Sequence, residues 1–262
     1  QYHHSINEAQ DGNIWACSKK LTSSMEPPNN AVKYWDNFLV KVDVNTGETI
    51  LNKSVSQILA ENGYSYIIHG IGNQVQPSGN DPLHLNDIEP VLTDSPYWKT
   101  GDLFLSFRNR SLIILYRPET NKILRLIQGP FLNQHDVDIL SESKISLFNN
   151  NASNYETQDT SGMKMDESNP NTRCSGIVIY NFEDSTFTSL MANQFQTEKI
   201  FTLTQGKHDI LKNGDVFVES QNKGTVYIFN EKRMLLKKYY NKPNNNFVEP
   251  PHWVRIYENI PF

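Results

Sequence analysis

The apolar residues of this chain gather in short runs that are separated by polar turns. Two such runs, 111–116 and 176–180, are each followed by a polar turn and then by a second apolar run. Short runs rich in Val, Ile, Tyr and Phe between turn residues are typical of antiparallel hairpins. The pattern therefore predicts an all-β chain.

This pattern of runs and turns occurs four times along the chain. Each copy begins with a His, continues through an apolar stretch, a polar turn and an apolar run, and ends with a second hairpin. Four strands in about 45–50 residues is the size of a propeller blade. We therefore predict a single β-propeller domain over residues 1–262, with repeat units starting near residues 4, 84, 135 and 208.

The repeat units are unevenly spaced, and two insertions account for the excess length. Residues 55–61 have the pattern of a short helix that ends before Gly63. Residues 149–173 are rich in Asn and nearly free of apolar side chains. Long polar segments of this kind run over protein surfaces, so we expect a surface loop at 149–173.

Composition and charge exclude several classes of protein. The chain has 24 basic and 29 acidic side chains, a net charge of −5, and no basic cluster, which argues against a nucleic-acid or membrane partner. No apolar run approaches the roughly 18–20 residues that cross a bilayer. Cys17 and Cys174 lack the spacing of a metal site or a disulfide scaffold, so we expect free, buried thiols.

The histidines that open the four units are the strongest candidates for chemistry. In a propeller the first strand of each blade lines the central channel, so equivalent positions of different blades converge. His4, His84, His135 and His208 are therefore expected to meet around one channel mouth, with His3 as an alternative to His4. A structural role, in which each ring binds a neighbouring carbonyl group, is the competing interpretation.

A cationic partner follows the second unit's channel-facing hairpin. Arg108 lies in the segment Ser106–Ser111 and is expected to point toward the same mouth, although a solvated turn is the simpler interpretation. Its planar fork of donors suits an oxyanion such as sulfate or phosphate. Three histidines also resemble a catalytic zinc site, and that alternative stays open.

At these residues the sequence resembles the bacterial arylsulfate sulfotransferases, which move a sulfuryl group between phenols without a nucleotide donor. The similar segments are His3–Ile6 with Gly12–Ile14, His84–Ile88, Ser106–Ser111, Gly129–Asp136 and Leu147–Asn150. They lie in the family's order and cover residues 3 to about 150, while the C-terminal third is similar mainly as blades.

The resemblance implies a six-bladed propeller, of which about four blades are readable here. The chain begins at Gln1 rather than Met, and we expect it to be a partial chain whose two remaining blades precede Gln1. The resemblance also implies a periplasmic or secreted protein, no cofactor, and an aryl sulfate donor with a phenolic acceptor. Formation of a homo-oligomer is left open.

By the same resemblance, His135 is the nucleophile and forms a transient sulfohistidine. His4, His84 and Arg108 are expected to hold the sulfuryl oxygens and assist proton transfer. The expected substrate-binding residues are Asn86, Asn109 and His208. A neutral imidazole is a competent nucleophile near pH 7, and a covalent intermediate implies ping-pong kinetics.

Two alternatives from other functional classes remain at this point. A propeller can serve as a binding module without catalysis, because fold alone does not fix function. The same set His4, His84 and His135 would also suit a zinc-dependent hydrolase or lyase. The two alternatives are distinguished by where the histidines point and by the metal content of the protein.

Overall fold

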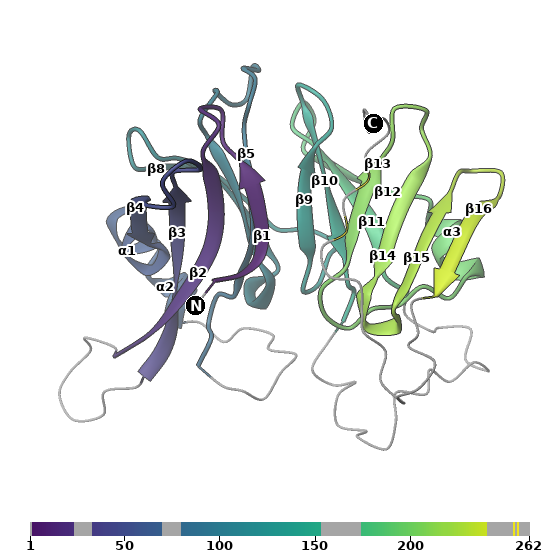
Figure 1. Cartoon of the computed structure of the whole chain (residues 1–262), viewed down its shortest axis with the longest axis horizontal. Coiled ribbons are helices and arrows are strands. Elements are labelled where there is room, and N and C mark those ends of the chain that lie inside the picture. The colour runs from purple at the N-terminus through teal and green to yellow at the C-terminus, as the bar shows by residue number, and fades with distance from the viewer. Residues whose placement is uncertain are drawn as a thin grey trace.

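The computed structural model describes residues 2–23, 33–69, 80–152, 174–239, 254 and 256. The described strands form four separate four-stranded sheets, and within each sheet the strands follow one another in chain order (Figure 1). All neighbouring strands pair in an antiparallel manner. The all-β prediction is confirmed, and each sheet has the form of a propeller blade.

The first two sheets come from the N-terminal half of the chain. Their strands are β1 (Tyr2–Glu8), β2 (Ile14–Ser23), β3 (Lys33–Val42), β4 (Thr49–Ser54), β5 (Leu85–Pro90), β6 (Leu103–Phe107), β7 (Leu112–Arg117) and β8 (Lys122–Ile127). The helices of this half are α1 (Val55–Glu61), α2 (Tyr66–His69) and the 3-10 turn η1 (Arg108–Arg110).

The other two sheets come from the C-terminal half. Their strands are β9 (His135–Ile139), β10 (Lys144–Asn149), β11 (Gly176–Asn181), β12 (Thr186–Leu190), β13 (Lys207–Ile210), β14 (Val216–Ser220), β15 (Thr225–Phe229) and β16 (Met234–Tyr239). The helices of this half are α3 (Ala192–Thr197) and the 3-10 turn η3 (Gln221–Lys223).

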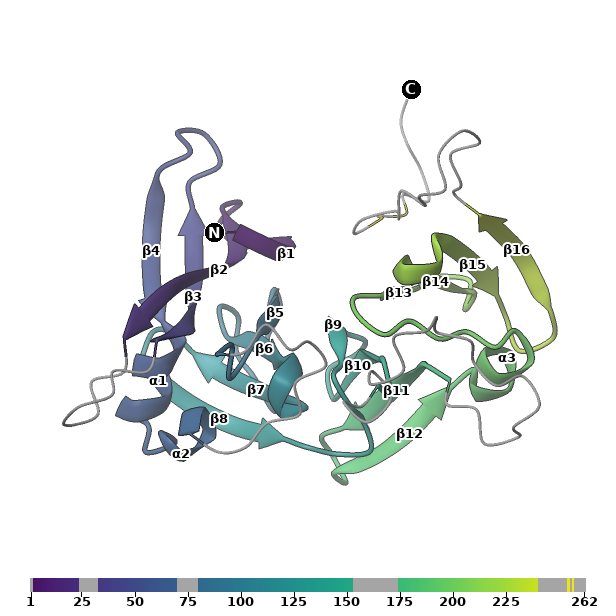
Figure 2. The ribbon, with the colours of Figure 1, turned by 90° about the horizontal axis from the view of Figure 1, so that it is seen from below.

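The four sheets follow one another around an arc. Figure 2 shows that the first strands β1, β5, β9 and β13 lie on the inner side and the last strands β4, β8, β12 and β16 on the outer side. Successive inner strands contact one another along the arc. This arrangement brings the start of each repeat unit toward a common centre.

Three apolar cores join neighbouring sheets, because both faces of the central strands are buried. On β6, Leu103 and Leu105 pack into the core shared with the first sheet, whereas Phe104 between them packs into the core shared with the third sheet. A third core, which includes Phe148 and Val218, joins the last two sheets. Alternation along a strand therefore explains why 112–116 is a continuous apolar run.

The predicted helix at 55–61 is confirmed as α1, with the same bounds. The side chain of Ser54 caps it by accepting a hydrogen bond from the backbone N–H of Gln57 at 3.0 Å. Ile58 and Leu59 of α1 pack into the core between the first two sheets. None of the helices described here is long and apolar enough to span a membrane.

Two further expectations concern the cysteines and the polar segment. Among the described residues Cys17 and Cys174 form no disulfide, but only Cys17 is buried and Cys174 is half-buried. The loop expected at 149–173 falls outside the described residues from residue 153 onward. At its start, Asn149 is the last residue of β10, and Asn150 is fully buried.

Candidate active site

Three of the four repeat histidines meet on the inner side of the arc. His4 lies on β1, His84 directly precedes β5, and His135 begins β9. The Nε2 atoms of His4 and His84 are 3.0 Å apart. The ring of His4 also contacts that of His135, with ring centroids 5.5 Å apart. Residues separated by 51 to 131 positions in the sequence therefore form one cluster.

Irregular strand pairing explains how these side chains leave the regular pleat. The register between β1 and β2 shifts between Tyr2 and Ile6, around His4, which has a φ of 61°. His84, with a φ of 54°, stands directly before a second shift on β5. A third shift adjoins His135 on β9, where Asp136 has a φ of 52°. Such bulges re-aim a side chain, here toward the centre of the arc.

Arg108 lies beside the histidine cluster and not in solvent. Arg108 is 3% exposed, and its backbone N–H donates to the carbonyl of His84 at 3.0 Å. The guanidinium Nε and Nη2 have no hydrogen-bond partner among the described residues. Burial lowers the pKa of Arg108 to about 10, so the group stays positively charged at neutral pH.

The Nδ1 atoms of His84 and His135 are held by different kinds of side chain. His84 Nδ1 lies 2.9 Å from a carboxylate oxygen of Asp81. His135 Nδ1 lies 2.7 Å from the amide oxygen of Asn150. The backbone N–H of Gln205 donates to His135 Nε2 at 3.2 Å. Each of these contacts restricts how the ring can turn and where it carries its proton.

His84 and His135 are both neutral at pH 7. Burial lowers the pKa of His135 well below its usual value, and the positive charge of Arg108 lowers it further. Burial also lowers the pKa of His84, although the Asp81 carboxylate opposes this shift. A buried neutral imidazole near a fixed guanidinium can act as a nucleophile or base toward an anionic substrate.

The two asparagines predicted to bind substrate lie next to this cluster, and both make backbone contacts. Asn86 donates to the carbonyl of Gln134 at 2.7 Å, and Asn109 donates to the carbonyl of Asp81 at 2.6 Å. The amide oxygen of each is buried without a partner among the described residues. These asparagines therefore hold the segments that carry His135 and Asp81, and their oxygens stay available.

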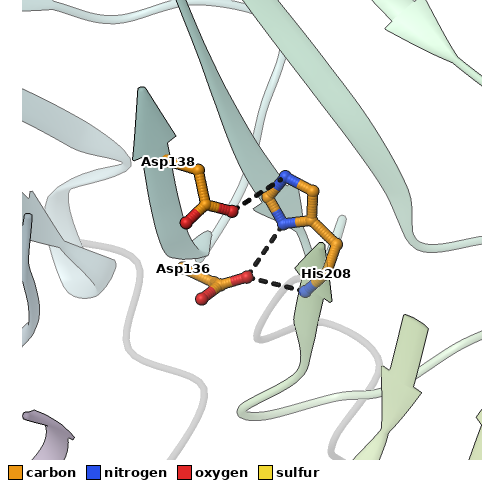
Figure 3. A group of neighbouring side chains, drawn as sticks. All are labelled: Asp136, Asp138 and His208. Atoms are coloured by element: carbon orange, nitrogen blue, oxygen red, sulfur yellow. Dashed lines mark hydrogen bonds and ion pairs between the residues drawn. The ribbon is translucent and has the colours of Figure 1, made fainter. Parts of the chain in front are cut away.

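His208 is placed differently from the other three histidines. It sits on a strand without a register shift, paired with Val218. Its Nδ1 is 2.9 Å from Asp136, and its Nε2 is 3.6 Å from Asp138 (Figure 3). The hydroxyl of Ser146 lies closer to Nε2, at 2.7 Å. Both ring nitrogens of this fully buried residue are thus occupied by protein groups.

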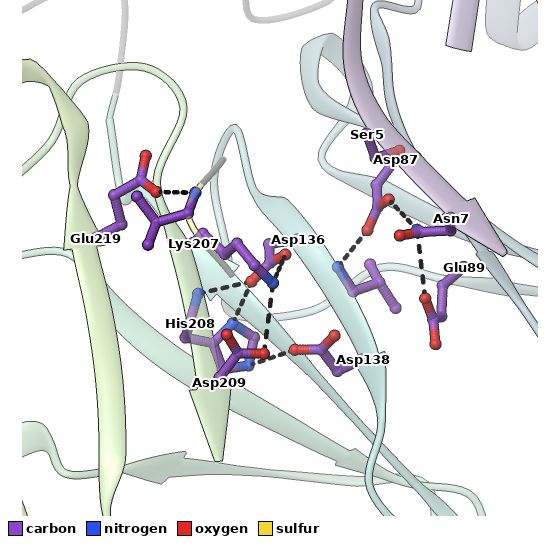
Figure 4. A network of polar contacts seen from close by, with 12 residues as sticks. Ser5, Asn7, Asp87, Glu89, Asp136, Asp138, Lys207, His208, Asp209 and Glu219 are labelled. Carbon is purple, nitrogen blue, oxygen red and sulfur yellow. Dashed lines mark hydrogen bonds and ion pairs between the residues drawn. The ribbon is translucent and has the colours of Figure 1, made fainter. Parts of the chain in front are cut away.

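His208 belongs to a buried acidic network that links the inner strands (Figure 4). The ammonium of Lys207 lies 3.3 Å from Asp136 and 3.4 Å from Asp209. Burial would raise the pKa of Asp136, but Lys207 and the hydrogen bonds from His208 lower it. Burial raises the pKa of Asp138 and of Glu89, and neighbouring carboxylates add to both shifts.

Metal binding was one alternative for the histidines. Among the described residues, the only three potential ligand atoms within 4.8 Å of one another belong to Asp136, Asp138 and His208, not to the predicted zinc set. Lys207 already supplies a cation to Asp136. We therefore assign this group a structural role in joining β9 to β13.

Sequence reasoning did not identify Asp81, Asn150 or the turn around Gln205. Asn150 lies in a segment that carried the family resemblance, but its polar surroundings placed it in the expected surface loop. Asp81 precedes His84 by three residues and belongs to no repeated pattern. No sequence signal distinguishes the turn around Gln205, because its contact with His135 is made by the backbone.

Comparison with known proteins gives a match to one protein family. The family profile described as arylsulfotransferase (ASST) matches residues 1–241. No curated protein matches.

The solved structures to which the chain is similar include the following three, all at low sequence identity. The RRP9 WD40 repeats share 9% identity at a TM-score of 0.46, with 91% of this chain and 53% of that chain covered. A protein of unknown function from Bacteroides caccae shares 11% identity at a TM-score of 0.47, with 89% of this chain and 80% of that chain covered. Virginiamycin B lyase from Staphylococcus aureus shares 10% identity at a TM-score of 0.41, with 92% of this chain and 71% of that chain covered. The chain spans about half the length of the first of these.

Proposed function

The chain belongs to the arylsulfotransferase (ASST) family, and on that premise we propose that it is an aryl-sulfate sulfotransferase. The proposed reaction moves a sulfuryl group from an aryl sulfate to a phenolic acceptor by a ping-pong mechanism, with His135 as the nucleophile. No nucleotide sulfate donor takes part. The small-molecule substrates and a location outside the cytoplasm, periplasmic or secreted, belong to the same proposal.

The observation that carries this proposal is the buried guanidinium of Arg108 beside three clustered histidines. Two of its nitrogens are buried without a partner among the described residues, and an unpaired buried donor is costly unless a ligand satisfies it. A sulfate ester presents oxygens that such a fork binds well. His4, His84 and His135 contact one another, and the charge of Arg108 acts on His84 and His135.

The first half-reaction forms a covalent intermediate. The lone pair on His135 Nε2 attacks the sulfur of the aryl sulfate, an N–S bond forms, and the S–O bond to the aryl group breaks. The aryl group leaves as phenolate. Sulfuryl transfer resembles phosphoryl transfer, in which a fixed cation that holds the equatorial oxygens contributes most to catalysis.

The second half-reaction returns the enzyme to its starting state. The oxygen of a phenolic acceptor attacks the sulfur, its proton passes to a base, and the N–S bond breaks so that the electron pair returns to Nε2. Before the first attack the N–H of Gln205 has to move away from Nε2, since it occupies the lone pair that attacks, and it can return only after the N–S bond breaks. The turn at Gln205 is therefore part of the proposed cycle.

His135→Asn tests the proposal directly. Sulfuryl transfer from an aryl sulfate to a phenol is measured for the wild-type protein and for this variant, and we expect transfer to be lost in the variant. His84→Asn should reduce transfer less severely, because that ring does not form the covalent bond. Circular dichroism establishes that each variant is folded.

Three outcomes would overturn the assignment. Undiminished transfer by His135→Asn would show that another group is the nucleophile. A stoichiometric zinc ion that is lost together with activity in His4→Ala would favour the hydrolase or lyase alternative. The binding-module alternative would be favoured by a wild-type protein that binds aryl sulfates without cleaving them.

A further inference from the structure

His84 and His135 differ in the chemistry of the side chain that contacts their Nδ1 atom. His84 is backed by a carboxylate, Asp81, and His135 by a neutral amide, Asn150. Both partners sit on Nδ1, which leaves Nε2 of His84 to contact His4 and Nε2 of His135 to accept the backbone N–H of Gln205. A pair of similar groups with different partners is a common way for one site to separate two tasks.

The orientation of the Asn150 amide is fixed by two backbone carbonyls. Its Nδ2 donates to the carbonyl of Thr202 at 2.9 Å and to that of Gln205 at 2.6 Å. Carbonyl oxygens only accept, so the amide nitrogen must face them and the amide oxygen must face His135. That oxygen in turn only accepts, so Nδ1 of His135 carries the proton and Nε2 carries the lone pair.

The carboxylate of Asp81 is fixed just as firmly. One oxygen accepts from the backbone N–H of His84 at 3.0 Å and from the Asn37 amide at 3.3 Å. The other accepts from Nδ1 of His84 and lies 3.7 Å from the ammonium of Lys19. Burial would raise the pKa of Asp81, but the hydrogen bond and charge of His84 hold it at about 2. The carboxylate is therefore a permanent negative charge behind His84.

We propose that Asp81 and Asn150 are positioning residues that give the two histidines different tasks in sulfuryl transfer. Asn150 keeps His135 a neutral nucleophile that reacts through Nε2, and Asp81 makes the His84–His4 pair the carrier of the acceptor's proton. This inference rests on the proposed function and adds to it the reason why His135 and the His84–His4 pair have different tasks.

The proton balance follows from the 3.0 Å contact between Nε2 of His84 and Nε2 of His4. The neutral pair shares one proton at this contact and keeps another on His84 Nδ1. When the acceptor phenol attacks the sulfohistidine, the pair takes up its proton and becomes a cation, which Asp81 stabilises from behind. The pair then releases that proton to solvent, and His135 has regained its lone pair from the broken N–S bond.

Asn150 has no charge, and a neutral partner suits the role of His135 as the nucleophile. A carboxylate in its place would favour the protonated imidazolium, which has no lone pair to attack with. The amide instead accepts the Nδ1 proton without stabilising a second one. Because Asn150 also binds the turn at 202–205, it sets the ring and the capping N–H of Gln205 at the same time.

The charged and titratable groups that face these rings come from several elements. His84 faces Asp81, Arg108 and Lys19 as well as His4. His135 faces Arg108 and His84, with His4 against its ring. The cations Arg108 and Lys19 disfavour the protonated rings, so Asp81 is the one group among these that favours a proton on the His84–His4 pair.

Two exchanges of partner test the inference through the pH dependence of each half-reaction. Asn150→Asp places a carboxylate behind His135, so the acid limb of kcat/KM for the aryl sulfate donor should move to higher pH by about one unit. Asp81→Asn removes the charge behind His84, so the acid limb of kcat/KM for the acceptor should move to lower pH. Acceptor turnover at neutral pH should also fall by about 10²-fold in Asp81→Asn.

Matched controls come from the same sheets. Asn181→Asp adds the same charge at the turn after β11, where the amide oxygen accepts from the backbone N–H of Glu183. Asp94→Asn removes a charge from an exposed loop in the second sheet, where the side chain binds Thr100 and Lys99. Neither control should move a limb of either profile. Asp81→Glu should restore part of the lost acceptor turnover.

The outcomes separate this inference from the proposed function. If the wild-type protein transfers no sulfuryl group, the proposed function fails. If it does transfer and both variants lose activity while each limb stays at the wild-type pH, Asp81 and Asn150 have only a structural role and the inference fails. Limbs that shift in the directions given support both.

Discussion

At the scale of single residues, local breaks in strand pairing decide which histidines join the site. His4, His84 and His135 each stand at or beside a register shift, and their rings meet. His208 stands on a regularly paired strand, and its ring turns to Asp136 and Ser146. The repeat in the sequence predicted four equivalent histidines. It could not show the difference, because a bulge depends on the partner strand as well as on the strand itself.

The single-residue prediction concerns Arg108. Arg108→Lys keeps the charge but removes the planar fork, and Arg108→Gln removes both, so we expect transfer to fall by about 10²-fold in the first and further in the second. Steady-state kinetics with an aryl sulfate donor and a phenol measure this. Arg125→Lys, on β8, should retain wild-type transfer, because that side chain binds Tyr180 and Ser185 outside the site. Wild-type turnover in Arg108→Gln would exclude the guanidinium from the reaction.

At the scale of elements, the turn before β13 links the last sheet to His135. Gln205 and Gly206 have φ values of 63° and 102°, so the chain turns sharply just where the Gln205 N–H meets the imidazole. A Cβ on Gly206 would collide with the ring of Phe148 and the methyl group of Thr202. The sequence predicted the strands on both sides of this turn. It did not predict the contact, because backbone atoms make it.

Gly206→Ala tests the role of this turn against Gly214→Ala. Both glycines have positive φ, but an added Cβ at Gly214 meets no described residue within 4 Å. The backbone strain, about 1 kcal/mol, is therefore common to both variants, and only Gly206→Ala adds the collision. We expect a larger loss of stability and a loss of transfer in Gly206→Ala alone, measured by chemical unfolding and enzyme assay. Equal effects of the two substitutions would contradict a special role for this turn.

At the scale of the whole molecule, the fold combines apolar cores between sheets with a polar interior along the inner strands. The hairpin pattern and the four-strand repeat were sufficient to predict the sheets, since period-two patterning and turn residues are local signals. The polar interior was not predicted. Asp87, for example, accepts hydrogen bonds from Asn7 of β1 and Val137 of β9, and each partner comes from a different sheet.

This polar interior makes stability depend on pH in a direction that can be tested at Asp87. Burial, together with the charge of Asp136, raises the pKa of Asp87 to about 6. Between its ordinary value and about 6 the folded state binds the proton more tightly than the unfolded state, so this contribution to stability is lost as pH rises through that window. Asp87→Asn removes the contribution. The variant should therefore gain about 1 kcal/mol relative to the wild-type protein between about pH 5 and about pH 8.

Thermal or urea unfolding at the two pH values measures this difference. The titrations of His84 and His135 act on both proteins alike. Loss of the Asp87 charge also lowers the pKa of Glu89 and Asp138, which favours the variant at higher pH in the same direction. Asp94→Asn is the control, because its pKa is already lowered to about 2 by hydrogen bonds from Thr100 and Lys99, and its effect should be the same at both pH values. A variant–wild-type difference at Asp87 that does not change with pH would contradict the account of the polar interior.

The central claim is that His135 carries the sulfuryl group, and the most direct measurement is to trap that intermediate. The protein is mixed with an aryl sulfate radiolabelled at sulfur in the absence of a phenolic acceptor, quenched in alkali, digested and analysed by mass spectrometry. The account predicts one labelled peptide that contains His135, with the mass of one SO₃ group on the imidazole, and release of the label when a phenol is added before quenching. Label on any other residue, or transfer to phenol without labelled protein, would contradict it.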